Sequence, residues 1–130
     1  MTPVTQLVKD IAKAISVMEG FDKVGSVSQR NNNPGNLRSW GSNEVVNGYV
    51  KFPTAEAGWA ALHTQVSKNI ARGLTMREFF AGQRDEFGRV LPGKYPGYSP
   101  GADNNHPVLY AKFVAAKVGL VDIDTPLNKV

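Results

Sequence analysis

The chain has 130 residues, 42% of them hydrophobic and 20% charged, which suits a single soluble domain spanning residues 1–130. It has no cysteine, so disulfides and thiolate metal sites are excluded. The two histidines, His63 and His106, show no metal-ligand spacing, and we expect neither a metal nor a cofactor. The net charge of +4 comes from dispersed basic residues, which favours an anionic partner but predicts no nucleic-acid-binding patch.

No apolar stretch approaches the roughly 20 residues that a membrane-spanning helix needs, so we expect no stable membrane insertion. Residues 1–6 lack the charged and apolar regions of a signal peptide. We therefore expect that the protein reaches any target outside the cytoplasm by another route. There is no internal repeat, and we expect the isolated domain to be a monomer.

The first predicted helix opens at Thr2 and Pro3, which suit a helix cap and the first helical position. Its buried face is marked by apolar residues spaced four, four and three apart: Leu7, Ile11, Ile15 and Met18. Gly20 ends this helix, so Glu19 lies in its last turn. The negative end of the helix dipole makes that position unfavourable for a glutamate. We therefore favour a chemical role for Glu19 over a purely structural one.

Residues 22–36 are predicted to form a loop dense in turn-forming residues, including Asn31-Asn32-Asn33-Pro34-Gly35-Asn36. An acid facing an amide-rich loop suits a sugar-cleaving cleft, because the acid can donate a proton while the amides hold hydroxyl and acetamido groups. The asparagines are also ordinary turn formers, and this alternative stays open. Segments 37–40 and 48–52 are predicted to pair as a β-hairpin around a loop at 41–47.

Three further helices are predicted. Thr54 caps the first, Gly73 ends it, and its buried face is marked by Trp59, Leu62, Val66 and Ile70. The capping box Thr75-Met76-Arg77-Glu78 opens a short helix. Pro107 opens the last helix, with inward-facing Tyr110, Phe113, Val114 and Val118. Residues 83–105 are predicted to be irregular and residues 120–130 to be a packed strap, so the fold class is mainly α with one small hairpin.

Several of these motifs occur together in one known group. Met18-Glu19-Gly20-Phe21 and the segments 30–38 and 49–58 resemble small phage and prophage proteins of the lysozyme-like, lytic-transglycosylase superfamily. The segment 104–110 is similar to a later motif of that group, with Asn105-His106 where the group has Asn-Asp. The resemblance implies an α+β lysozyme-like domain whose hairpin lies beside the active-site cleft.

The resemblance also implies an activity. Glu19 takes the position of the catalytic glutamate, which cleaves the β-1,4 bond between N-acetylmuramic acid and N-acetylglucosamine in peptidoglycan glycan strands. The residues implied to bind substrate are Ser28, Gln29, Asn33, Asn36, Arg38, Tyr98, Asn105 and Tyr110. One familiar type of phage muramidase has an aspartate nine residues after the glutamate, where this chain has Ser28. This difference favours a lytic transglycosylase, in which Glu19 acts as acid and then as base to form 1,6-anhydro-muramic ends.

Other functions stay open. A hydrolytic muramidase (lysozyme) would need a second carboxylate, for which Asp22 and Glu44 are the candidates. A non-catalytic wall-binding or virion structural module would not need an ionisable Glu19, and a nucleic-acid binder would use the positive charge. We expect a phage-derived bacteriolytic protein, either carried in the virion with other virion proteins or released from the host cytoplasm to act on the cell wall.

Overall fold

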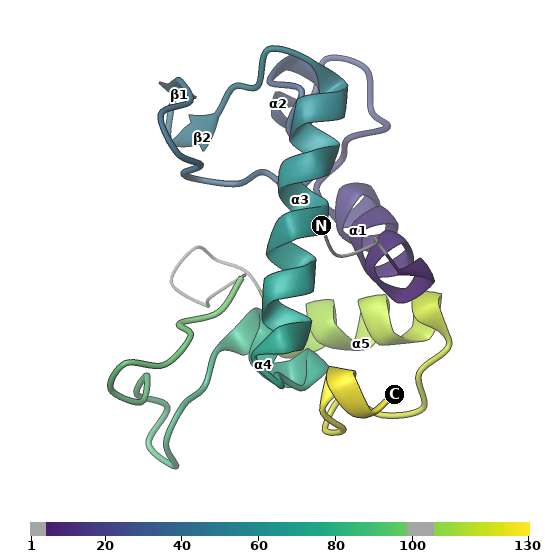
Figure 1. Ribbon diagram of the computed structural model, residues 1–130, viewed down its shortest axis with the longest axis vertical. Coiled ribbons are helices and arrows are strands. Elements are labelled where there is room, and N and C mark those ends of the chain that lie inside the picture. The colour runs from purple at the N-terminus through teal and green to yellow at the C-terminus, as the bar shows by residue number, and fades with distance from the viewer. Residues whose placement is uncertain (1–4, 99–105) are drawn as a thin grey trace. The chain divides into compact units, whose positions relative to one another are not determined.

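The computed structural model describes residues 5–98 and 106–130. These residues form five α-helices, one 3-10 helix and one two-stranded antiparallel sheet (Figure 1). The prediction of a mainly helical protein with one small hairpin is therefore confirmed. The chain divides into two compact units, residues 1–67 and 68–130, and the assignment of one domain stays a prediction. None of the described helices is long and apolar enough to cross a membrane.

Helix α1 (Gln6–Met18) begins after Thr5, whose Oγ1 accepts a hydrogen bond from the N–H of Val8 at 3.2 Å. The predicted opening at residues 2 and 3 lies outside the described residues. Ile11 and Ile15 are fully buried, as predicted, whereas Met18 is 41% exposed. Met18 was expected in the core, but it is the last residue of α1 and lies outside the buried face of the helix. That face also includes Val8, Ala12 and Ala14.

Two further helices contribute to the first unit. The single turn α2 (Val27–Arg30) lies inside the predicted loop and is capped by Ser26, whose Oγ accepts from the N–H of Gln29. Helix α3 (Ala55–Ala71) contains the boundary between the two units. Thr54 caps α3 as predicted, by accepting a hydrogen bond from the N–H of Ala57 at 3.1 Å.

The hairpin is formed by β1 (Val45–Val46) and β2 (Tyr49–Val50), with Val45 opposite Val50. The second predicted strand is therefore confirmed at its centre, but the first, at residues 37–40, is wrong. The reason is the turn Asn47-Gly48, in which both residues have positive φ, 51° and 87°. Such a two-residue turn reverses the chain at once and pairs its immediate neighbours.

In the second unit, α4 (Met76–Ala81) packs against α5 (Pro107–Val118) (Figure 1). The predicted capping box is confirmed, because Thr75 and Glu78 bond reciprocally. Phe79 and Phe80 are fully buried, and the Phe80 ring stacks on Tyr110 with the ring centroids 4.3 Å apart. An aromatic core thus holds α4 and α5 together.

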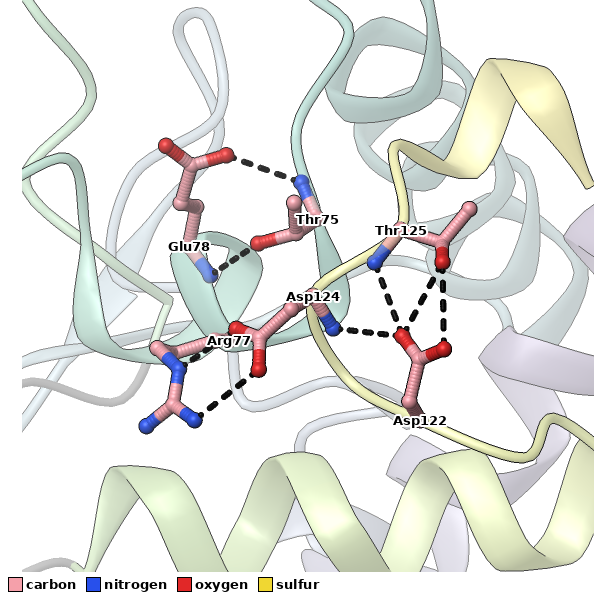
Figure 2. A network of polar contacts seen from close by, with 6 residues as sticks. All are labelled: Thr75, Arg77, Glu78, Asp122, Asp124 and Thr125. Atoms are coloured by element: carbon pink, nitrogen blue, oxygen red, sulfur yellow. Dashed lines mark hydrogen bonds and ion pairs between the residues drawn. The ribbon is translucent and has the colours of Figure 1, made fainter.

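The C-terminal segment is fixed to the start of α4 by polar contacts (Figure 2). Arg77 binds both carboxylate oxygens of Asp124, at 2.8 and 3.2 Å. The carboxylate of Asp122 accepts hydrogen bonds from the backbone N–H groups of Asp124 and Thr125, at 2.8 and 2.9 Å. The segment ends in η2 (Leu127–Lys129). The strap predicted at residues 120–130 is therefore confirmed in part: residues 122–127 are bonded to the start of α4, whereas residues 127–129 form a 3-10 helix.

Candidate active site

Glu19 follows the last residue of α1 and caps that helix. Its backbone N–H donates a hydrogen bond to the carbonyl of Ile15 at 2.9 Å. Gly20 then adopts a φ of +78° and turns the chain, and its carbonyl accepts a hydrogen bond from Ser26 Oγ at 2.7 Å. The Glu19 side chain is only partly exposed. A rigid helix end, rather than a loose loop, therefore positions the predicted acid.

The structure brings the predicted acid together with one predicted substrate-binding amide. Nδ2 of Asn36 donates a hydrogen bond to Oε1 of Glu19 at 3.1 Å. Asn36 has a φ of +48°, a left-handed conformation that asparagine tolerates better than most residues. Its Oδ1 is buried and has no hydrogen-bond partner in the described part of the chain. A buried acceptor of this kind is costly, and in native structures it often marks a functional site.

Asn33 holds the loop that carries Asn36. It has no exposed surface, and its Nδ2 donates to the carbonyls of Leu37 and Val50, at 3.0 and 2.9 Å. Its Oδ1 accepts a hydrogen bond from the N–H of Leu37 at 2.9 Å. One side chain thus ties both ends of the turn at Asn36 to strand β2. The structure gives Asn33 a positioning role beneath the site.

Ser28 and Gln29, which were predicted to bind substrate, also make bonds that hold the loop. Ser28 is fully buried, and its Oγ donates to the carbonyl of Asn33 at 2.7 Å. The Oε1 of Gln29 accepts a hydrogen bond from the N–H of Gly25 at 2.9 Å. Ser28 therefore supports the loop from inside. It occupies the position, nine residues after Glu19, at which one type of phage muramidase has an aspartate.

Gly58 of α3 allows the loop to approach the helix closely. A Cβ atom at this position would collide with the carbonyl oxygen of Asn32 and would lie 2.9 Å from Cδ of Pro34. Only a residue without a side chain fits here. Sequence reasoning missed this contact, although a glycine inside a helical pattern was a signal for it.

Beside the loop, the exposed guanidinium of Arg38 lies 4.9 Å from the centre of the Tyr49 ring, and its Nη2 donates to the Tyr49 hydroxyl at 3.4 Å. The edge of the Phe21 ring meets the indole of Trp59, with centroids 5.5 Å apart. These contacts supply aromatic surface near both ends of the segment from Glu19 to Arg38.

The predicted residues of the second unit have a different environment. The Tyr98 ring lies 5.8 Å from the ring of Phe79 and 5.9 Å from that of Phe80. Tyr110 is 5% exposed and belongs to the same aromatic core. Asn105 lies outside the described residues. Six of the predicted site residues belong to the first unit: Glu19, Ser28, Gln29, Asn33, Asn36 and Arg38.

Other acids were considered as a second carboxylate. Asp22 forms an exposed ion pair with Lys13 at 3.7 Å, while Glu44 is exposed and lines a shallow pocket with Asn43 and Lys51. Within residues 5–98 and 106–130, no group of three or more His, Asp or Glu side chains could hold a metal ion. The chain matches no protein-family profile, no curated protein and no solved structure.

Proposed function

We propose that this protein is a lysozyme-like enzyme that cleaves the β-1,4 bond between N-acetylmuramic acid and N-acetylglucosamine in bacterial peptidoglycan. The observation that carries the proposal is the hydrogen bond between Asn36 and Glu19, which orients a carboxyl group at a rigid helix end. A general acid needs such a fixed orientation toward the bond that it protonates.

The proposed reaction is a lytic transglycosylation. Protonated Glu19 gives its proton to the glycosidic oxygen, the C1–O bond breaks, and positive charge develops at C1 of the muramic acid. The substrate's own acetamido oxygen supports C1. The Glu19 carboxylate then takes the proton of the 6-hydroxyl as that oxygen attacks C1 and closes the 1,6-anhydro ring. Glu19 is protonated again, and no water is consumed.

Asn36 supports this chemistry by orienting the acid, because its Nδ2–H holds one oxygen of the Glu19 carboxyl group. Because Asn33 fixes the loop before substrate arrives, these groups need little rearrangement during the reaction.

The absence of a motif-supported second carboxylate favours transglycosylation over hydrolysis. Ser28, at the position of the muramidase aspartate, is buried and bonded to a backbone carbonyl. Asp22 is paired with Lys13. We further propose that the protein is phage-derived and meets peptidoglycan from a virion or after release from the host.

Turbidity loss of purified cell walls tests the proposal, with wild type compared with Glu19→Gln. The amide cannot donate the carboxylic proton, so we expect the clearing rate to fall by about 100-fold or more. The matched control is Glu56→Gln, which makes the same change at an exposed residue in the first turn of α3 and should clear walls at the wild-type rate. Equal clearing by wild type and Glu19→Gln would refute the assigned acid. No clearing by wild type would favour a binding module.

A further inference from the structure

A second feature of the first unit is a pocket of about 290 Å³ between α2 and the β-hairpin. Two valines give it apolar walls, Val27 from α2 and Val46 from β1. The other lining residues are polar or aromatic: Arg30, Asn31, Asn47, Tyr49 and Lys51. The lining includes two cationic side chains and no acidic one.

The two cations at this pocket form no ion pair in the described part of the chain, although Glu44 lies beside Lys51 and accepts a backbone hydrogen bond from it. Neither Arg30 nor Lys51 forms an ion pair with any described residue, whereas Arg77 and Arg89 each bind an aspartate. Arg38, which lies over the ring of Tyr49, brings a third positive charge to the same residue of the pocket. Positive charges gathered on one concave surface attract an anion.

An amide side chain lies beside these cations. Asn31 is only 7% exposed and lines the pocket, and its side chain makes no hydrogen bond within the described part of the chain. Its amide atoms are not among the buried polar atoms that lack a partner, so they stay accessible to solvent. Its backbone groups are satisfied, because its N–H donates to Val27 and its carbonyl accepts from Phe52. An accessible amide at the pocket wall can offer its donor and acceptor groups to a ligand.

We propose that this pocket binds the free carboxylate of the peptide stem attached to the glycan, an inference that rests on the proposed function. The guanidinium of Arg30 and the ammonium of Lys51 bind the carboxylate. The amide of Asn31 bonds the last peptide unit. Val27 and Val46 cover a small apolar side chain such as a methyl group.

The position of the pocket agrees with this assignment. The stem is attached to the muramic acid, which is the sugar whose C1–O bond Glu19 would break. Positions 31 and 36 are five residues apart in one loop, so their Cα atoms are separated by at most about 18 Å. One substrate can therefore place its sugar against Asn36 and Glu19 and its stem against Asn31. The pocket then selects peptide-bearing glycan.

The first test compares glycan that carries peptide stems with glycan from which an amidase has removed them. For the double variant Arg30→Gln/Lys51→Gln, we expect KM to rise by about tenfold or more on the peptide-bearing strands and to stay at the wild-type value on bare strands. Lys9→Gln, which removes one positive charge from the exposed face of α1, should match wild type on both substrates. An equal change on both substrates, or no change on either, would overturn the proposal.

The second test does not depend on activity. N-acetyl-D-alanyl-D-alanine is titrated into the isotope-labelled full chain and followed by NMR, with the same dipeptide bearing a C-terminal amide as the matched ligand. We expect shifts at the backbone amides of Asn31, Asn47 and Tyr49 with the free carboxylate and none with the amide. Equal shifts with both dipeptides, no shifts, or shifts with inorganic phosphate alone would refute the peptide-carboxylate site. If wild type cleaves no glycan, the proposed function fails, while the titration still decides the pocket.

Discussion

The Nδ2–H of Asn36 meets Oε1 of Glu19 at 3.1 Å, although seventeen positions separate the two residues in the sequence. Asn36 reaches the acid because its backbone is left-handed and because Asn33 closes the turn beneath it. The orientation of the acid therefore depends on a loop, and the loop depends on one buried amide.

Substitution of Asn36 by glycine tests this dependence. Glycine accepts a φ of +48° without strain, so the change removes the hydrogen bond and leaves the backbone conformation available. A hydrogen bond to a charged group contributes about 1.5–3 kcal/mol to stability, so Tm should fall by several degrees. Because the acid also loses its orientation, we expect wall cleavage at temperatures well below unfolding to slow by roughly 10- to 100-fold.

Asn32→Gly is the matched control for this substitution. Asn32 has a φ of +52°, and its Nδ2 donates to the carbonyl of Phe52 at 3.1 Å rather than to the acid. Loss of this hydrogen bond should lower the free energy of unfolding by about 1 kcal/mol, and therefore Tm by a few degrees. The cleavage rate at temperatures well below unfolding should stay unchanged. If both variants slow cleavage equally, Asn36 has no special relation to Glu19.

The product of the reaction distinguishes the two proposed chemistries. We expect muropeptides ending in 1,6-anhydro-N-acetylmuramic acid, which mass spectrometry separates from reducing ends by the mass of one water. Glu44→Gln should leave both the rate and the product unchanged. Hydrated ends together with a large loss of rate in Glu44→Gln would instead identify a muramidase with Glu44 as its second carboxylate.

Gly58→Ala should destabilise the protein despite the higher helix propensity of alanine. The added methyl group collides with Asn32 and crowds Pro34, and overpacking of this kind costs about 1–3 kcal/mol. Helix propensity alone would predict that alanine raises the free energy of unfolding by about 1 kcal/mol. Urea unfolding measures the difference, and Ala60→Gly at an exposed position of α3 gives the propensity effect by itself. A more stable Gly58→Ala protein would show that the loop does not press on α3.

The contact between Arg77 and Asp124 predicts a pH dependence of stability. The hydrogen bonds from Arg77 hold the pKa of Asp124 below its usual value of 3.8. A carboxyl whose pKa is lowered on folding stabilises the protein fully above its unfolded pKa, and the contribution is lost as pH falls through the folded pKa. Asp124→Asn should therefore lower Tm at pH 7 and have no effect well below pH 3.8. Glu86→Gln, an exposed acid of the second unit, is the control, and a Tm difference for Asp124→Asn that does not depend on pH would contradict the prediction.

Local signals predicted most helix ends. Thr75 and Glu78 form the predicted capping box, and the helix predicted from Pro107 begins there and is capped by Gly119 with a left-handed φ of +79°. These features depend on neighbouring residues, which the sequence displays directly. The first strand was misplaced because residues 41–47 were predicted as the hairpin loop, and the Asn47-Gly48 turn, which is a strong hairpin signal, was divided between that loop and the second strand.

The site was predictable only in part. The end of the first helix and the resemblance predicted Glu19 as the acid, and the composition of the loop predicted nearby amides in general. Which amide turns inward could not be predicted, because Asn31, Asn32 and Asn33 have the same local preferences. Burial of Asn33 against Leu37 and Val50 is a tertiary effect, as is the close approach of Gly58 to the loop.

The three consecutive asparagines are chemically identical yet not interchangeable. Asn31 lines a pocket, Asn32 bonds the carbonyl of Phe52, and Asn33 closes the turn below Asn36. Deleting one of them would not remove a spare residue from a polar stretch. It would shift the register of the segment by one residue, so that the remaining asparagines could no longer make their present contacts. One deletion would therefore disrupt the whole segment.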